Sequence, residues 1–328
     1  MNLWDIYHSN IPDFMLEFLQ TDSLQRLRNV GMNCGCEYTN FPIFRNIESY
    51  SRFDHSVGVG LIVWHFTGDV TQAVSGLLHD IATPAFAHVV DFLHNDHMRQ
   101  ECTESATEQV IRSSESLRRV LMQYDLPVES VWDYHCYPIA DNDTPKLSAD
   151  RLEYTLSNAV NFRIITKDDA MRLFSDLIVG LNEVEEPEIM FNSADTAYVF
   201  ANAALACSKI YVSDADRYAM ESLALLLRDA LVSGIISEKC LDLDEPTVID
   251  KILNSKLSHR WNRFCNYQEV NRVDGADSQA GALCVIAKKR CIDPYIQGLG
   301  RVSAVFPKFS TELKDFLDSS QDYWLIAK

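Results

Sequence analysis

Two stretches of sequence decide the fold: Ser51-Arg-Phe-Asp-His-Ser-Val-Gly-Val-Gly60 and Gly76-Leu-Leu-His-Asp-Ile-Ala82. Each places a histidine, His55 or His79, at the start or end of an apolar run with helical spacing, so we expect both side chains to point into an interior. Six of the nine histidines fall within 43 residues of this part of the chain. A single buried histidine is usually a hydrogen-bonded core residue, but the adjacent pair His79-Asp80 with a second histidine upstream indicates a binding site.

These side chains have the chemistry of metal ligands. Imidazole nitrogens and carboxylate oxygens supplied together suit Mn, Fe, Co, Ni, Zn or Mg. A site for one metal needs about four protein ligands and open positions for water and substrate, so a later carboxylate is required. The best candidate is Asp150, in Leu147-Ser-Ala-Asp-Arg-Leu-Glu-Tyr-Thr-Leu156. By itself Asp150 would be interpreted as the first residue or cap of a helix, where aspartate is favoured.

The rest of the chain predicts a mainly α protein. Apolar residues recur at helical spacing in four segments, which are residues 61–81, 105–124, 149–165 and 216–236. After about residue 240 the pattern changes to short β-branched or aromatic runs separated by proline and glycine, at residues 282–292, 301–306 and 322–327. We therefore expect a helical domain over residues 1–240 and a small α+β C-terminal subdomain over residues 241–328.

The charge of the chain is uneven. The 328 residues carry a net charge of −18, which disfavours an electrostatic grip on a nucleic-acid backbone. Residues 251–328 hold 12 Lys and Arg against 8 Asp and Glu, a net charge of +4, so the first 250 residues carry −22. The basic run Lys288-Lys289-Arg290 is interpreted as a solvated strand end, with a phosphate site as the alternative.

No feature of the sequence indicates a membrane or a secreted protein. The longest apolar run, residues 57–66, is far too short to cross a bilayer, and residues 1–10 lack a basic region followed by an apolar core. Nine scattered cysteines favour reduced thiols over a disulfide framework. The close pair Cys34 and Cys36 lacks a second pair at zinc-site spacing. We therefore expect a cytoplasmic protein.

The order His55, His79-Asp80, Asp150 resembles the signature of the HD-domain metal-dependent phosphohydrolases. Four blocks of sequence resemble, more narrowly, the dGTPase and dNTP triphosphohydrolase branch: Leu24-Gln-Arg-Leu-Arg28, Arg52-Phe-Asp-His-Ser-Val-Gly-Val59, His79-Asp-Ile-Ala-Thr-Pro-Ala-Phe-Ala-His88 and Asp150-Arg-Leu-Glu-Tyr154. The resemblance covers about residues 20–235, in the right order. It implies an HD-domain helical core, one divalent metal (Mn, Fe, Co, Ni, Zn or Mg), a nucleotide or other small phosphate ester as substrate, and a homo-oligomer.

The resemblance also implies roles for individual residues. His55, His79, Asp80 and Asp150 would hold the metal, which lowers the pKa of a bound water and polarises a phosphoryl oxygen. The catalytic pair would be His88 and Asp91, with His88 as general acid; a surface histidine beside a helical aspartate is the alternative. Contacts to the substrate phosphate are implied for three further residues, Arg52, Arg151 and Tyr154, although Arg151 also fits an ordinary exposed helix position. Arg26 and Arg28 match positions that contact a regulatory nucleotide in some members.

Four positions depart from the family pattern. Two histidines found in many triphosphohydrolases of this branch are replaced by Thr83 and Thr103, a sugar-reading glutamine by Met32, and an aspartate that touches the 3′-hydroxyl by Asn158. A triphosphate should be held less firmly, because two potential cationic donors have become hydroxyls, and discrimination of the sugar should change. Replacement donors are available in His94 and His97, although exposed loop positions also explain them.

Three hypotheses follow. The first is a metal-dependent phosphoric ester hydrolase that cleaves a nucleotide by metal-activated water, with dNTP triphosphohydrolysis as the family expectation and nucleoside monophosphate hydrolysis as the variant. The second is a catalytically weak nucleotide-binding regulatory protein. The third is a di-iron oxygenase of the same superfamily, which would need ligands for a second metal.

Overall fold

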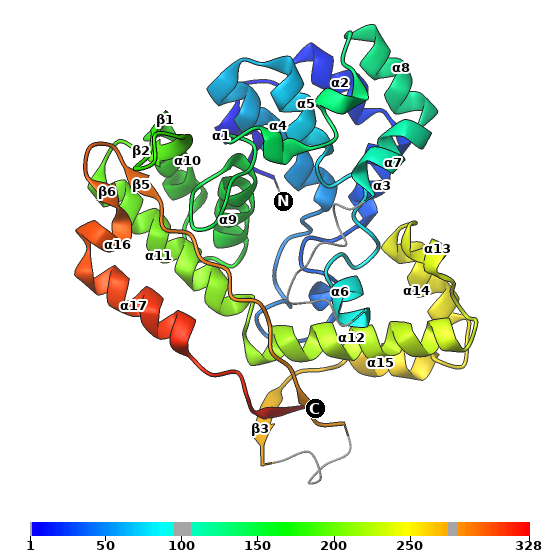
Figure 1. Ribbon diagram of the computed structural model, residues 1–328. Helices are drawn as coiled ribbons and strands as arrows, with labels where there is room; N and C mark the ends of the chain where they lie inside the picture. Colours follow the sequence, from blue (N-terminus) through cyan, green and yellow to red (C-terminus); the bar gives the residue numbers. More distant parts are fainter. Residues whose placement is uncertain (1, 95–105, 275–280) are drawn as a thin grey trace.

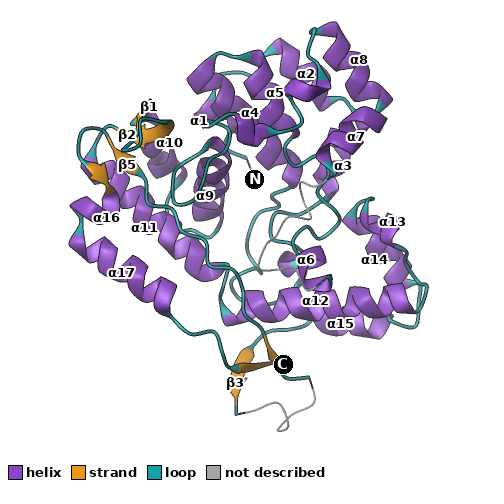
Figure 2. Ribbon diagram, viewed as in Figure 1, coloured by secondary structure: helices purple, strands orange, loops and turns teal. Residues whose placement is uncertain are grey.

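Helices dominate the computed structural model, which describes residues 2–94, 106–274 and 281–328 (Figures 1 and 2). In chain order the α-helices are α1 (Trp4–Tyr7), α2 (Asp13–Leu19), α3 (Asp22–Arg26), α4 (Arg52–Thr67), α5 (Val70–Leu78), α6 (Val89–Leu93), α7 (Thr107–Ser113), α8 (Glu115–Gln123), α9 (Ala149–Asn161), α10 (Lys167–Ser175), α11 (Ala194–Ile210), α12 (Asp214–Val232), α13 (Glu238–Leu241), α14 (Glu245–Leu253), α15 (Ser258–Cys265), α16 (Val302–Val305) and α17 (Pro307–Asp318). The prediction of a mainly α fold is confirmed.

The strands form two small sheets. The first has the order β1-β2-β5-β6, and the second has the order β3-β7-β4. Their bounds are β1 (Leu177–Leu181), β2 (Pro187–Phe191), β3 (Val270–Val273), β4 (Leu283–Cys284), β5 (Tyr295–Ile296), β6 (Gly300–Arg301) and β7 (Trp324–Ala327). Strand β2 pairs in parallel with β5, so a backbone ladder joins the two parts that the sequence divides at residue 240. That division stays a prediction.

Two large apolar clusters organise the helices. The first is built from α1–α5, α7–α11, α16, α17 and β2, and the second from the loop of residues 34–44 with α6, α12–α15 and β7. Figure 1 shows α4 and α5 in the upper part of the molecule and α6 and α12 below them. A cavity of about 580 Å³ lies between the two clusters and is lined by side chains of α4, α6, α9 and α12.

Some helix boundaries differ from the periodicity. The expected segment 61–81 contains a break, because Gly68 adopts φ 62° at the end of α4 and Asp69 caps α5. The segment 105–124 is divided at Ser114, whose hydroxyl accepts a hydrogen bond from the backbone of Leu117. Residues 302–305 form α16 rather than a strand, since the carboxylate of Asp293 accepts from both the backbone and the hydroxyl of Ser303. At these points a left-handed glycine or side-chain hydrogen bonds to the backbone determine where the helix begins or ends, although the apolar pattern predicts otherwise.

Close packing of α4 on α5 brings the two histidine segments together. Helix α4 begins at Arg52 because Ser51 and Asp54 form a capping box. A Cβ atom on Gly60 would lie 3.1 Å from Cβ of Leu77, and one on Gly76 would lie 3.1 Å from Val63. Because both positions are glycine, the backbones of α4 and α5 can approach each other closely. This packing places His55, near the start of α4, close to His79, at the end of α5.

A buried pair of glutamates supports the loops beneath the cavity. Glu245 accepts hydrogen bonds from the backbone of Gly31 and Phe86 and from the hydroxyl of Tyr38. Burial, together with the neighbouring Glu245 carboxylate, raises the pKa of Glu37 to about 8. Glu37 is therefore a carboxyl group that the fold keeps protonated at neutral pH.

The raised pKa of Glu37 predicts that the protein loses stability as the pH rises from acid to slightly above neutral. The folded state retains at Glu37 a proton that the unfolded chain releases at the ordinary pKa of 4.5, so the free energy of unfolding falls as the pH rises from 4.5 to about 8. Glu37→Gln should weaken this dependence and stabilise the protein at pH 8 relative to the wild type. Urea unfolding at pH 6 and pH 8 measures it, with the exposed Glu238→Gln as control. An unchanged pH dependence in Glu37→Gln would contradict the assignment.

Candidate active site

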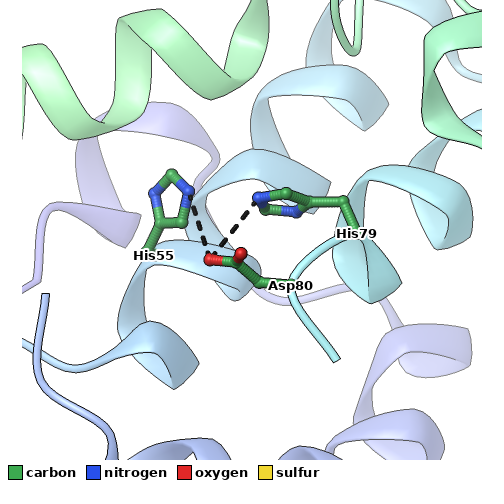
Figure 3. A group of neighbouring side chains, drawn as sticks. All are labelled: His55, His79 and Asp80. Atoms are coloured by element: carbon green, nitrogen blue, oxygen red, sulfur yellow. Dashed lines mark ion pairs between the residues drawn. The ribbon is translucent and has the colours of Figure 1, made fainter. Parts of the chain in front are cut away.

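Four side chains that are far apart in the sequence converge at the wall of the cavity. Nε2 of His55 lies 3.0 Å from Oδ1 of Asp150 and 3.9 Å from Oδ2 of Asp80, and Nε2 of His79 lies 3.7 Å from both oxygens. Figure 3 shows the two imidazoles turned toward the Asp80 carboxylate. The structure thus brings together all four ligands that the sequence predicts, from α4, the end of α5 and the first turn of α9.

Hydrogen bonds on the far side of each ring fix the direction of both imidazoles. Nδ1 of His79 donates to the carbonyl of Gly76 over 2.7 Å, and Nδ1 of His55 lies 2.6 Å from Oε2 of Glu153. Nε2 is therefore the nitrogen that each histidine presents to the carboxylates. A carboxylate or carbonyl partner on the other ring nitrogen is typical of histidines that bind metals.

The two carboxylates of the cluster are ionised and stabilise positive charge beside them. Burial lowers the pKa of His55, but hydrogen bonds to Asp150 and Glu153 outweigh it and raise that pKa to about 10. Burial raises the pKa of Asp80 and Asp150, but Arg52 and His79 beside Asp80, and His55 beside Asp150, hold both values well below the usual range. Two imidazoles and two ionised carboxylates fit a divalent metal, which would take the place of the Nε2 proton of His55.

Two further residues hold the Asp80 carboxylate. The guanidinium of Arg52 donates to Oδ2 over 2.8 Å, and the hydroxyl of Thr83 donates to Oδ1 over 2.8 Å. Arg52, expected on the substrate phosphate, therefore contacts a residue that is predicted to bind the metal. Thr83, which stands where many proteins of the resembled branch have a histidine, orients the same carboxylate.

His88 and Asp91 form the expected pair. Nδ1 of His88 lies 2.9 Å from Oδ2 of the buried Asp91. Nε2 of His88 lies 3.3 Å from a guanidinium nitrogen of Arg290. Burial and the cationic Arg290 and Arg52 lower the pKa of His88, although its bond to Asp91 opposes them. The ring is therefore neutral near pH 7, with its proton on Nδ1.

The backbone in front of His88 is strained. Phe86 and Ala87 have φ values of 64° and 45°, a region that residues with a Cβ rarely adopt. The turn also requires a glycine opposite, because a Cβ on Gly35 would lie 3.0 Å from the ring of Phe86. Strain of this kind persists where the surroundings fix the chain, and it often accompanies a functional site.

Arg151 and Tyr154 both line the cavity. Arg151 donates to the side chain of Asn142 over 2.8 Å and lies 3.2 Å from Oδ1 of Asp141. Two of the positions that depart from the family pattern, Met32 and Asn158, also line the cavity. The side-chain amide of Asn158 donates a hydrogen bond to the hydroxyl of Tyr211. Thr103 lies outside the described residues.

Two further residues, Glu153 and Arg290, contact the predicted site residues. Glu153 sits in the quoted block Asp150-Arg-Leu-Glu-Tyr154 and is fully buried behind His55. Its position three residues after Asp150 puts both on one helix face, which was the available signal. Arg290 lines the cavity although its basic run was interpreted as a solvated strand end. No local sequence pattern predicts the contact between Arg290 and His88, because the two residues are 202 positions apart.

Two other residues with expected binding roles, Arg26 and His94, lie beside groups of the protein itself. Arg26 donates to the carbonyls of Ile81 and Thr83, so it supports the turn after Asp80. His94 is half exposed, 3.9 Å from Glu238, and His97 lies outside the described residues.

Burial raises the pKa of the Cys34 thiol to about 12. The cysteines in the described ranges are free thiols, and no helix there is long and apolar enough to cross a membrane.

Comparison with known proteins gives distant relatives. No protein-family model matches the chain. The chain is 22% identical over 314 residues to the metal-dependent phosphohydrolase Cns2 of Cordyceps militaris, covering 92% of this chain and 87% of that protein. It is 25% identical over 260 residues to the uncharacterized protein YdhJ of Bacillus subtilis, covering 78% and 76%. A deoxynucleoside triphosphate triphosphohydrolase SAMHD1 homolog of Dictyostelium discoideum is 29% identical over 99 residues, which are 26% of this chain and 18% of that one.

Solved structures share the fold. A phosphohydrolase from Bacteroides thetaiotaomicron superposes with a TM-score of 0.64 at 14% identity, covering 97% of this chain and 96% of that one. A hypothetical protein from Aquifex aeolicus gives a TM-score of 0.57 at 20% identity, covering 77% and 71%. The fold is thus the mainly α fold of a solved phosphohydrolase. With the histidine–aspartate cluster, these similarities support a metal-dependent phosphohydrolase of the HD type.

Glu153 should control metal affinity without contacting the metal. Glu153→Gln removes the negative charge behind His55, so we expect the affinity for Mn²⁺ to fall about 10- to 100-fold, as for other partners of metal-binding histidines. Titration calorimetry measures the change.

A matched control is available in Glu188, which is equally buried but pairs with Arg301 through its carboxylate. Glu188→Gln should lower the free energy of unfolding and leave Mn²⁺ affinity unchanged. Wild-type Mn²⁺ affinity in Glu153→Gln would overturn the role given to this carboxylate.

Proposed function

We propose that the protein is a metal-dependent phosphohydrolase that hydrolyses a nucleotide, with one divalent metal held by His55, His79, Asp80 and Asp150. The observation that carries the proposal is the convergence of these four side chains beside the His88–Asp91 pair in one cavity. The similarity to the metal-dependent phosphohydrolase Cns2 supports it, as does the similarity over 99 residues to a deoxynucleoside triphosphate triphosphohydrolase.

Different residues of the chain would orient the metal ligands and position the proton of His88. When bound, the divalent metal would supply Lewis acidity for the phosphoryl group and its attacking water. Arg52 and Thr83 hold Asp80, and Glu153 holds His55, so the ligands are oriented in advance. Asp91 keeps the proton of neutral His88 on Nδ1. A bound phosphate adds negative charge beside this ring, which raises its pKa and allows Nε2 to carry a second proton for the leaving oxygen.

The cavity suits a nucleotide in size and lining. Its volume of about 580 Å³ is within the range of small-molecule sites. Aromatic side chains of Tyr134, Tyr154 and Tyr211 line it and offer faces for a base or sugar.

A nucleoside monophosphate is the second candidate substrate, and the departures from the resembled branch favour it. Thr83 stands where the resembled branch has a histidine, and its hydroxyl is engaged with Asp80, so it does not replace a cationic donor for a polyphosphate. Asn158 stands where that branch has an aspartate on the 3′-hydroxyl, and its amide is engaged with Tyr211. One phosphate needs fewer cations than three.

The test is product analysis by ion-exchange chromatography after incubation with Mn²⁺, Mg²⁺, Co²⁺ or Fe²⁺ and a panel of dNTPs, NTPs and nucleoside monophosphates. Nucleoside plus intact triphosphate would establish triphosphohydrolysis. Orthophosphate released from monophosphates alone would establish a nucleotidase on the same site. No product from any member of the panel would contradict the proposed function and favour the nucleotide-binding regulatory protein.

Asp80→Ala serves as the inactive control for the panel. It removes a metal ligand, and we expect Mn²⁺ binding and turnover to be lost together while the circular dichroism spectrum remains helical. Turnover that persists in Asp80→Ala would show that the activity arises elsewhere in the preparation or at another site.

A further inference from the structure

An extended segment of the C-terminal part, residues 285–292, crosses the cavity; we call it the strap. It connects β4 in one sheet with β5 in the other, and Figure 1 shows it in orange between the part of the molecule that carries β3 and the part that carries β5 and β6. Both ends are anchored. The backbone of Ala287 donates to Gln321 over 2.6 Å, and the carbonyl of Cys291 accepts from Thr144 over 2.9 Å.

The basic run is divided between two sides of the strap. Lys288 and Arg290 line the cavity, whereas Nζ of Lys289 donates to the carbonyls of Leu317 and Ser319 over 2.6 and 2.5 Å at the end of α17. This alternation is what an extended backbone produces, because successive side chains point in opposite directions. The strap therefore delivers two of its three cations to the cavity.

Arg290 lies against the residues that the proposed function uses. Its guanidinium is 3.3 Å from Nε2 of His88 and shares a side-chain hydrogen bond with Tyr154. A guanidinium is only a donor, so Nε2 of His88 is the acceptor in this contact. The same nitrogen is the one that must face a substrate oxygen.

The other cavity arginines are engaged with carboxylates. Arg52 is 2.8 Å from Asp80, and Arg151 is 3.2 Å from Asp141. Each has an anionic partner that a phosphate would have to displace. At His88, Arg290 contacts a neutral nitrogen, and a phosphate oxygen is a stronger acceptor for a guanidinium than that nitrogen because it is anionic.

We propose that the strap is the phosphate-binding arm of the site: Arg290, assisted by Lys288, binds the phosphoryl oxygens of the substrate and in doing so releases Nε2 of His88. The proposal rests on the proposed function for the identity of the ligand as a phosphate ester. The planar fork of Arg290 suits two phosphate oxygens, and Lys288 adds a point charge. Substrate binding and the availability of His88 are thereby linked, because Nη2 of Arg290, which contacts Nε2 of His88, is also needed for a two-oxygen contact with phosphate.

The probe is inorganic phosphate, titrated calorimetrically into the full-length protein loaded with Mn²⁺. We expect Arg290→Gln to weaken phosphate binding about tenfold or more, the usual consequence of losing a charged hydrogen bond. Arg290→Lys should fall between Arg290→Gln and the wild type, since it keeps the charge and loses the fork. The matched control is Lys289→Gln, a neighbouring charge that faces away from the cavity, and its phosphate affinity should stay within about twofold of the wild type.

Mn²⁺ affinity and thermal unfolding of each variant separate a local effect from a general loss of structure. A variant Arg290→Gln that binds Mn²⁺ as the wild type does but has lost phosphate binding supports the strap assignment. Phosphate affinity unchanged in Arg290→Gln overturns it, and so does an equal loss in Lys289→Gln.

The two proposals can fail separately. Loss of phosphate binding in Arg290→Gln, together with no hydrolysis of the nucleotide panel by the wild type, would support the strap and contradict the proposed function. Hydrolysis by the wild type, with rate and phosphate affinity unchanged in Arg290→Gln, would support the proposed function and overturn the strap.

Discussion

The contact between His55 and the buried carboxylate of Glu153 is the interaction on which the site depends. Glu153 also accepts hydrogen bonds from Tyr50 and Ser157, and a Cβ atom on Gly58 would lie 2.5 Å from its side chain. One carboxylate thus joins α4, α9 and the loop before α4. It directs Nε2 of His55 toward Asp150, and without it the imidazole would have no fixed partner behind it.

The two sides of the cavity are formed by helices from different apolar clusters, and each side supplies a different kind of charged group. Helices α4, α5 and α9 belong to the first apolar cluster and supply the proposed metal ligands, whereas α6 and α12 belong to the second. Asp91, on α6, holds His88, and the strap adds Arg290 from the C-terminal part. Anionic ligands on one side and a guanidinium on the other are the charges that a metal and a phosphate require.

Sequence patterns predicted what is local or carried by a short motif. The histidine–aspartate blocks pointed to His55, His79, Asp80 and Asp150, and the resemblance to the HD-domain phosphohydrolases pointed to the pair His88 and Asp91. The contacts of Arg52 with Asp80 and of Arg290 with His88 were not predictable, because they depend on how distant segments pack. The breaks near Gly68 and Ser114 have a different cause, because a local cap ends a helix there despite continuous apolar periodicity.

Anomalous diffraction from crystals soaked in Mn²⁺ tests the central claim most directly. The account predicts one strong peak in the anomalous difference map within bonding distance of Nε2 of His55, Nε2 of His79 and the carboxylates of Asp80 and Asp150. A map with no peak at this cluster, or with the strongest peak elsewhere in the protein, would contradict it.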